Sequence, residues 1–575
     1  MHQLKIKESI KDEETHFLNQ DINTHADSSE PSAPLSSINS LYSFTLPSTI
    51  NIDFSTQDDD ILKDKRKEAY ECFRQGNFLQ ALEYYEEILE NCQHNVEDLK
   101  SASTWDFSYN KCKKINELIK ALCRNTMPTS LNLYGNGLGL EEEKAVADVL
   151  CKNNTLESLD LSCNPLGIGG GKALAEALCK NNTLKDLNLQ YNKLRSEGGK
   201  LLAGALSKNT TLTSLNLEGN RLGSEGGKAL ADALCKNNTL KNLNLKEIEL
   251  GSEGGKSLAD ALCKNYVLKY LNLKGNGLGP EGGKALANSL CKNTTLKDLD
   301  LGSNNLGSEG VKALADALCK NNTLEDLNLE ENELGSEGVK ALADALCKNV
   351  TLTSLNLIRN KIESEGGKAL ADALCKNNTL KDLNIRFNEL GSEGGKSLVN
   401  ALCDNTALEN LDLSYNNLGL GGKALADTLC KNNTLKVLNL RYNKLGPEGI
   451  ESLANALCKN ITLTSLILEG NKIGPERGKE LADALCKNTA LKELVLKFNN
   501  LGLKGGKAIA NALCKNNTLN NLNLGYNNLG SEIGISLADA ICKNTTLTSL
   551  SLEGNKLGSE ETGLISRAGF TVLYK

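Results

Sequence analysis

Cysteine is the residue type whose abundance and spacing first suggest chemistry in this chain. The 575 residues include nineteen cysteines, and fifteen of these recur at one position of a sequence repeat, from Cys123 and Cys151 to Cys542. Regularly spaced thiolates could ligate a metal, but no C-x-x-C pair occurs. Equivalent positions of adjacent helices lie roughly 8–10 Å apart, whereas a disulfide needs Cα atoms within about 7 Å. We therefore expect free thiols packed near helix ends, in a reducing cytoplasmic compartment.

A phosphate-binding loop is the second candidate for chemistry. The segment Gly251-Ser252-Glu253-Gly254-Gly255-Lys256-Ser257 ends as such a loop does, and residues 391–397 repeat it. The first glycine of the motif is missing, because Leu250 and Leu390 stand in its place. The segment is also a variant of the ordinary start of each repeat's helix. We expect no nucleotide site here.

Histidine, the usual general base of nucleophilic catalysis, does not occur in the repeats. The four histidines are His2, His16, His25 and His94. Neither a Cys/His dyad nor a Ser/His/Asp set can form from repeat residues alone. We expect no enzymatic activity, no cofactor and no metal.

The elements that position these residues belong to a unit of 28 residues that recurs about sixteen times from Leu131 onward. A period of this length is typical of a solenoid. Residues 211–240 read TLTSLNLEGNRLGSEGGKALADALCKNNTL. Within them, the period-two alternation of residues 215–220 predicts a short strand with its leucines pointing inward. Leu230 and Leu234, four residues apart, predict a helix with one buried face.

The ends of this helix have recognisable signals. Ser224, or proline in copies such as the one with Pro280, predicts its start as an N-cap or as the first helical residue. Lys236 and Asn237 predict its end, through a cation and a residue that tolerates a left-handed backbone. With one strand and one helix per unit, parallel strands must line the inside of a curve.

One asparagine, Asn220 in this copy, follows the strand in fifteen of the sixteen units. An amide at the turn can satisfy backbone groups of the neighbouring turn. Ile248 is the exception, and we expect it to interrupt the asparagine ladder at a cost of roughly 1–3 kcal/mol.

The pattern L-x-x-L-x-L-x-x-N-x-L-x-x-x-G-x-x-x-L-x-x-x-L resembles the leucine-rich repeats of the ribonuclease-inhibitor class, which also occur in NOD-like receptors and in the Ran GTPase-activating protein. It covers about four-fifths of the chain. The resemblance implies an α/β fold, a leucine-rich-repeat horseshoe of about sixteen strand-helix repeats. It implies little about function, because the class is defined by architecture.

Three segments are expected along the chain. Residues 1–60, with three lysines against eleven acidic residues, predict a disordered acidic leader. Residues 61–111 predict a helical segment similar to one tetratricopeptide unit, and a generic helical hairpin is the alternative. Its last part, residues 93–111 with Trp105, is interpreted as a connector. Residues 112–575 are the repeat array with terminal caps, opened by a capping helix at residues 115–123. The tetratricopeptide resemblance is carried by Ala69, Gly76, Phe78, Ala81, Tyr85 and Ile88.

Charge and hydropathy exclude two classes of partner. The net charge is -7 and lies mostly in the leader, so the array is close to neutral and lacks the basic footprint that nucleic-acid binding needs. No window approaches eighteen apolar residues, and the N-terminus has no apolar signal region, so we expect neither a membrane span nor secretion.

Candidate binding residues emerge from a comparison between copies. Helix positions barely change, whereas the two residues before the ladder asparagine change freely. Aromatic residues and arginine dominate interface hot spots, and stacked strands would make these side chains neighbours. Drift at exposed positions of recently duplicated repeats is the alternative. The predicted partner-binding residues, on the second half of the concave rim, are Arg359, Arg386, Phe387, Tyr415, Arg441, Tyr442, Lys497, Phe498 and Tyr526.

The leading functional hypothesis is a non-enzymatic scaffold that binds a protein partner on its concave face. The first alternative is a regulator of a small GTPase, by resemblance to the Ran GTPase-activating protein. That family ends in a strongly acidic tail, whereas this sequence ends in GFTVLYK. The second alternative is a relative of the NOD-like receptors, although no nucleotide-binding module precedes the repeats.

Overall fold

The computed structural model describes residues 57–75, 77–91, 103–109, 118, 128–419 and 422–558. Residues 62–575 belong to one compact unit, and the repeats described below lie within it. The leader was predicted at residues 1–60, and its residues 1–56 lie outside the described part of the chain. Helix α2 (Gln57–Arg74) begins four residues before the boundary expected at residue 61.

Seventeen parallel strands of three residues each form one sheet in the described part of the chain. Each strand pairs with the next in chain order and in the same register, for example Leu215 with Leu243 and Leu327 with Leu355. The strands are β1 (Thr104–Asp106), β2 (Ser130–Asn132), β3 (Ser158–Asp160), β4 (Asp186–Asn188), β5 (Ser214–Asn216), β6 (Asn242–Asn244), β7 (Tyr270–Asn272), β8 (Asp298–Asp300), β9 (Asp326–Asn328), β10 (Ser354–Asn356), β11 (Asp382–Asn384), β12 (Asn410–Asp412), β13 (Val437–Asn439), β14 (Ser465–Ile467), β15 (Glu493–Val495), β16 (Asn521–Asn523) and β17 (Ser549–Ser551).

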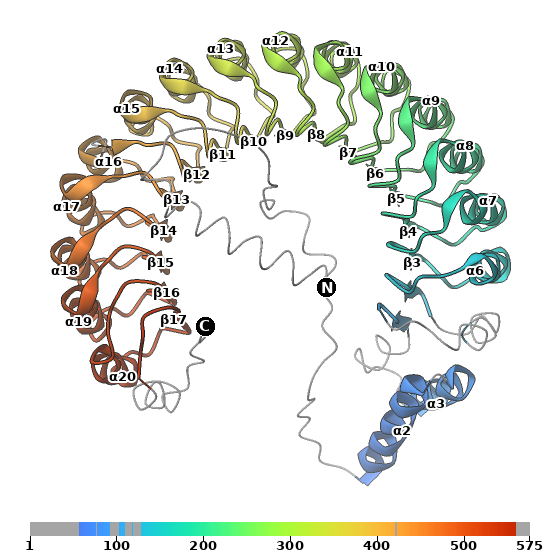
Figure 1. Cartoon of the computed structure of the whole chain (residues 1–575), viewed down its shortest axis with the longest axis horizontal. Helices are drawn as coiled ribbons and strands as arrows, with labels where there is room; N and C mark the ends of the chain where they lie inside the picture. The colour runs from blue at the N-terminus through green and yellow to red at the C-terminus, as the bar shows by residue number, and fades with distance from the viewer. Residues whose placement is uncertain are drawn as a thin grey trace. The chain divides into compact units, whose positions relative to one another are not determined.

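A helix follows each strand from β2 to β16 and packs beside the helix of the next repeat. Within the array, strands line the inner side of the curve and helices its outer side, as the horseshoe expectation requires (Figure 1). The helices are α6 (Leu140–Lys152), α7 (Gly167–Leu178), α8 (Arg195–Leu206), α9 (Gly223–Leu234), α10 (Gly251–Leu262), α11 (Gly279–Leu290), α12 (Gly307–Leu318), α13 (Gly335–Leu346), α14 (Glu363–Leu374), α15 (Gly391–Ala401), α16 (Gly422–Leu429), α17 (Gly446–Leu457), α18 (Gly474–Leu485), α19 (Gly502–Leu513) and α20 (Ile533–Lys543).

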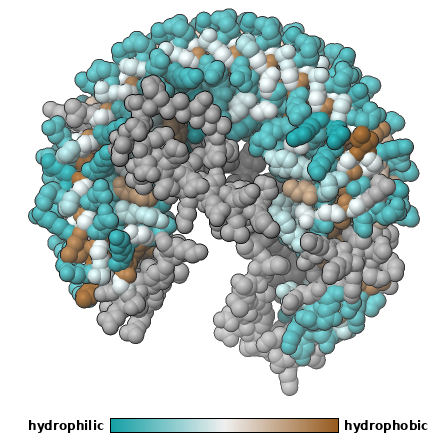
Figure 2. Space-filling view, viewed as in Figure 1, coloured by the Kyte–Doolittle hydropathy of each residue, from teal (hydrophilic) through white to brown (hydrophobic). Residues whose placement is uncertain are grey.

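The core is a continuous stack of leucine layers between the sheet and the helices. In the copy at residues 211–240, the strand leucines Leu215 and Leu217 and the helix leucines Leu230 and Leu234 are all buried. A fully buried leucine contributes about 1.5–3 kcal/mol. Because one repeat cannot bury its leucines alone, the stability of each layer depends on the layers on either side. Gly227 permits this spacing, because a Cβ there would lie 2.3 Å from Cδ2 of Leu250 in the next repeat. The outer surface over the helices is largely hydrophilic (Figure 2).

The helix starts differ from the sequence expectation. Helix α9 begins at Gly223, its N-cap residue is Leu222, and no side chain caps it; Ser224 is the second helical residue. The backbone N–H of Gly223 donates to the carbonyl of Ile248 in the next repeat at 2.9 Å. Because the next repeat takes up this N–H, a serine cap is not needed at that point.

The asparagine of the turn has the role that was predicted. Asn220 Nδ2 donates to the carbonyls of Leu189 (2.7 Å) and Leu217 (2.9 Å), one in the preceding repeat and one in its own. Its Oδ1 accepts the N–H groups of Asn192 (3.0 Å) and Leu194 (3.2 Å). The side chain therefore joins two turns that contain no regular secondary structure.

The helix-end asparagine forms a second ladder that the sequence analysis missed. Asn237 has no left-handed backbone; instead its buried Nδ2 donates to the carbonyls of Leu206 (2.9 Å) and Asn209 (3.1 Å). Its Oδ1 accepts the N–H groups of Thr239 (3.1 Å) and Leu240 (2.8 Å). The expectation of a left-handed terminator is wrong, because the amide is needed as a donor into the preceding repeat.

Two sites interrupt the turn ladder. Ile248 is fully buried, and among the described residues no acceptor remains for the N–H groups of Asn220 and Leu222. The other site was not foreseen: Oδ1 of Asn192 is buried without a partner. The preceding turn contains Pro165, and proline cannot adopt the positive φ that this position has elsewhere, for example 58° at Lys193.

The N-terminal end of the sheet lies earlier than expected. Strand β1 falls within the segment interpreted as a connector and pairs in parallel with β2, with Trp105 opposite Leu131. Trp105 is fully buried and packs with Phe107 (centroids 6.3 Å apart) and with Phe78 of helix α3 (Phe78–Asn91, also 6.3 Å). The array therefore begins before residue 112, and α3 packs on its first layer.

The rest of the N-terminal prediction is tested only in part. Helices α2 and α3 are two successive helices whose small core contains Ala69, Ala81, Tyr85 and Ile88. This arrangement agrees with a helical hairpin, and the tetratricopeptide assignment stays a prediction. The capping helix expected at residues 115–123 lies outside the described residues, apart from Leu118. None of the helices in the described ranges has the length and hydropathy that a membrane crossing requires.

Candidate protein-interaction surface

The residue just before the turn asparagine has a left-handed backbone in every described repeat. In the second half of the array this position holds φ values from 50° to 57° at Arg359, Phe387, Tyr415, Tyr442, Phe498 and Tyr526. Glycine occupies it in five other copies, including Gly219 and Gly470. A side chain in this conformation costs roughly 1–2 kcal/mol. The aromatic residues are thus held at a backbone cost that glycine avoids elsewhere in the same chain.

The aromatic side chains lie in two stacks that follow the curve of the sheet. Phe387 stacks on Tyr415, with centroids 4.1 Å apart and planes inclined by 19°, and Tyr415 stacks on Tyr442 at 4.9 Å and 22°. Phe498 stacks on Tyr526 at 4.5 Å and 20°. All five rings are partly exposed. The neighbourhood predicted from strand register is confirmed for these residues.

Gly470 separates the two stacks. Each ring leans toward the next repeat, and Tyr442 lies over the glycine: a Cβ at Gly470 would come within 2.5 Å of its ring. Gly554 receives the ring of Tyr526 in the same way. We call the residues before Gly470 the first cluster (Arg359, Arg386, Phe387, Tyr415, Arg441, Tyr442) and those after it the second cluster (Lys497, Phe498, Tyr526).

Each predicted cation of the surface lies over a ring. Arg386 lies 4.8 Å from the centroid of Phe387 and 4.9 Å from that of Tyr415. Arg359 lies 5.1 Å from Phe387, and Arg441 lies 5.5 Å from Tyr415. Cations at such distances are attracted to the ring faces by about 0.5–2 kcal/mol. The first cluster is therefore a stack of aromatic rings with arginine guanidinium groups lying over it.

The second cluster repeats this arrangement with lysine. Lys497 Nζ lies 5.0 Å from the centroid of Phe498 and 5.1 Å from that of Tyr526. Within each cluster the predicted cations and rings are therefore neighbours.

Carboxylates that the sequence analysis did not single out neutralise most of these cations. Glu331 pairs with Arg359 at 2.7 Å, and the buried Glu469 pairs with Arg441 at 3.1 Å. Glu553 lies 3.9 Å from Lys497. The two clusters consequently carry little net positive charge.

Two aliphatic residues next to the second cluster were also missed. Ile467 and Val495 are half-buried neighbours in β14 and β15, in register with Asn439 and Asn523 of the flanking strands. This strand position holds asparagine or aspartate in every strand from β2 to β13. A comparison of strand positions, rather than turn positions alone, would have found the two aliphatic residues.

The centre of the concave sheet is acidic instead. Asp298 and Asp326 lie opposite each other in β8 and β9, and Asp300 lies on the same face. Burial, followed by the charges of Asp326 and Asp300, raises the pKa of Asp298 to about 7. Burial also raises the pKa of Asp326 and of Asp300. These carboxylates therefore disfavour further negative charge at the middle of the face.

The first half of the array has no continuous stack of this kind among its described residues. Tyr191 lies over Gly219, and its single hydroxyl donor lies 3.3 Å from a carboxylate oxygen of Glu218 and 3.3 Å from one of Glu247. Lys246 pairs with Glu218 at 3.0 Å. Polar pairs take the place of stacked rings.

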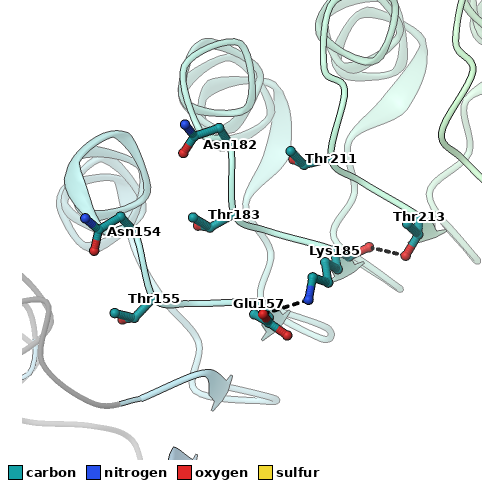
Figure 3. A pocket seen from close by; sticks show the side chains of 8 residues that line it. All are labelled: Asn154, Thr155, Glu157, Asn182, Thr183, Lys185, Thr211 and Thr213. Carbon is teal, nitrogen blue, oxygen red and sulfur yellow. Dashed lines mark hydrogen bonds and ion pairs between the residues drawn. The ribbon is translucent and has the colours of Figure 1, made fainter.

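A shallow depression of about 330 Å³ lies on the segments that lead into strands β3, β4 and β5, away from both clusters (Figure 3). Its lining consists mostly of asparagine and threonine side chains. Lys185 and Glu157 form an ion pair across it at 2.7 Å, and Thr213 donates to the carbonyl of Lys185 at 3.1 Å. These contacts belong to the segment that joins helix to strand in the repeat, and we assign no chemistry to the depression.

The remaining chemical candidates of the sequence are explained structurally. The segment that resembles a phosphate loop is the start of α10, where Lys256 pairs with Glu253 at 2.9 Å and Ser257 donates to the carbonyl of Glu253 at 3.0 Å. The sixteen described cysteines are free thiols. No group of three potential metal ligands occurs within the part of the chain that the structure describes.

Comparisons with known proteins point to the repeat itself. A family model described as "NLRC3 LRR domain" matches residues 193–571, and one described as "Leucine Rich repeat" matches residues 152–175 and 180–203. No curated protein matches the chain.

Two solved structures are similar to this chain at low identity. The yeast complex of Rad7 and Elc1 is 17% identical, covering 91% of this chain and 98% of that chain, with a TM-score of 0.38. The Leiomodin-1 Actin-Binding Site 2 is 22% identical, covering 27% of this chain and 88% of that chain, with a TM-score of 0.24. Similarity at this level carries no information on function.

Proposed function

We propose a function for a chain that belongs to the leucine-rich repeat family described as the NLRC3 LRR domain. Its repeats form a non-enzymatic scaffold for protein–protein interaction, and the two clusters on the concave face bind the partner. The residues that carry the binding are the nine predicted from the sequence.

The observation that carries this proposal is that neighbouring copies place stacked aromatic side chains at one left-handed position of the repeat. Phe387, Tyr415, Tyr442, Phe498 and Tyr526 occupy a position where glycine relieves backbone strain in other copies. Large rings kept side by side at such positions support a functional role. Stacking also holds the rings in place before binding, so less side-chain entropy is lost when a partner covers them.

Charge supports a protein rather than a nucleic-acid partner. Glu331, Glu469 and Glu553 accompany Arg359, Arg441 and Lys497. A surface that binds phosphates in series needs uncompensated cations, whereas rings, arginine and paired charges are common in protein interfaces.

A triple substitution of aromatic residues tests the proposal. Tyr442, Phe498 and Tyr526 are replaced by alanine, and partners are recovered from the native cell by affinity purification with quantitative mass spectrometry. We expect specific partners to be recovered about tenfold less than with the wild type, because such side chains dominate interface energies.

The matched control replaces three tyrosines of the other half of the array, Tyr134, Tyr191 and Tyr270, by alanine. If the aromatic triple variant recovers as much partner as the wild type, the two clusters are not the binding surface. The GTPase-regulator alternative is measured separately: we expect no change in GTP hydrolysis by a panel of small GTPases. Accelerated GTP hydrolysis would favour the GTPase-regulator alternative over the scaffold proposal.

A further inference from the structure

The first cluster contains one cation without a carboxylate. Arg359 and Arg441 have Glu331 and Glu469 as ion-pair partners, at 2.7 and 3.1 Å. Arg386, which lies between them, forms no ion pair with the residues that the structure describes, and its Nε is buried without a hydrogen-bond partner. A buried donor left unsatisfied is costly, so this guanidinium is poised to gain an acceptor.

The surroundings of Arg386 hold it in place but do not neutralise it. Its guanidinium lies against the rings of Phe387 and Tyr415, 4.8 and 4.9 Å from their centroids. Burial lowers the pKa of Arg386, and the charges of Arg441 and Arg359 lower it further. These three effects make the site favourable for an anion.

Asp412, the carboxylate whose charge acts on Arg386, is committed elsewhere. It accepts the N–H of Ser414 and Nδ2 of Asn439, both at 2.8 Å. Burial raises the pKa of Asp412. The compensating carboxylate is therefore missing from the first cluster.

We propose that the partner's docking segment is acidic and that one of its carboxylates pairs with Arg386 between the rings of Phe387 and Tyr415. This inference rests on the proposed function and adds the chemistry of the partner. Arginine suits the role because its planar fork can bind a carboxylate through two parallel hydrogen bonds while its face stays on a ring.

Defined peptides test the proposal on the full chain. Fluorescent decapeptides of alternating Gly-Glu, Gly-Gln or Gly-Lys are titrated with protein at physiological salt, and binding is followed by anisotropy. We expect the Gly-Glu peptide alone to bind the wild type, and Arg386→Gln to weaken it about tenfold. Arg386→Lys keeps the charge without the fork and should give an intermediate loss.

The control is Lys361→Gln, which removes an exposed cation of the adjacent repeat, itself paired with Glu333 at 3.4 Å. Circular dichroism verifies that each variant is folded. Equal weakening by the two glutamine variants, or Gly-Glu binding no tighter than Gly-Gln, would overturn the acidic segment.

The same variants separate the two proposals. If Arg386→Gln leaves both peptide binding and recovery of the cellular partner unchanged while the aromatic triple variant loses that partner, the interaction surface stands and the acidic segment falls. If the triple variant also retains the partner, the surface itself is wrong.

Discussion

Replacing Asn332 by isoleucine is expected to destabilise the array by about 3–5 kcal/mol. Its Nδ2 donates to the carbonyls of Leu301 (2.8 Å), Leu329 (3.1 Å) and Glu330 (3.0 Å), and its Oδ1 accepts the N–H groups of Asn304 and Leu306. Isoleucine removes every one of these bonds and leaves buried backbone groups unsatisfied. The loss therefore falls on two repeats at once.

The natural exception at Ile248 supplies a control of opposite sign. Ile248→Asn should restore an acceptor for the N–H groups of Asn220 and Leu222 and leave stability equal to or above that of the wild type. Urea denaturation and hydrogen exchange at residues 304 and 306 measure the first substitution, and exchange at residues 220 and 222 the second. A loss of similar size in both variants would contradict the ladder as the source of the effect.

Replacing Asp298 by asparagine is expected to stabilise the protein by about 2 kcal/mol at pH 8 and to have little effect at pH 4. The folded-state pKa of Asp298 is raised to about 7 by burial, with Asp326 and Asp300 as further causes. A carboxyl whose pKa is raised on folding lowers stability as the pH rises, from its ordinary value near 4 up to about 7. Because solvent partly screens this carboxyl, the expected gain in stability is smaller than the full pKa shift would produce.

Urea midpoints of the wild type and the variant across this pH window check the expectation. Asp316→Asn, at an exposed position of α12, is the matched control and should leave the urea midpoint unchanged across this pH window. Some pH dependence should remain in the variant, because burial also raises the pKa of Glu143 to about 7. A gain of equal size at pH 4 and pH 8 would show that the carboxylate charge is not the cause.

The repeat architecture could be predicted because each layer repeats the contacts of the layer before it. Leucine spacing alone then places strand, helix and turn asparagine in every copy. Strand β1 escaped detection because Trp105 and Phe107 stand where other copies have leucine, although Asn110 follows Trp105 at the spacing at which Asn136 follows Leu131. Their period-two alternation was the available signal.

The candidate surface could be predicted only as a set of neighbours. Parallel register brings Phe387, Tyr415 and Tyr442 side by side whatever their rotamers. Stacking and ion pairing depend instead on the direction in which each ring leans, which follows from the left-handed turn. Residue types at one position cannot give that direction, so the pairing of Glu469 with Arg441 required the structure.

The direction of the turn ladder has a consequence for how the protein is made. Most ladder asparagines close the turn of the repeat before them, as Asn332 does for the N–H groups of Asn304 and Leu306. A chain leaves the ribosome N-terminus first, so every newly emerged repeat waits with an open turn until its successor arrives. Such a partly made array therefore ends in a repeat whose turn has backbone N–H groups that await the asparagine of the next repeat.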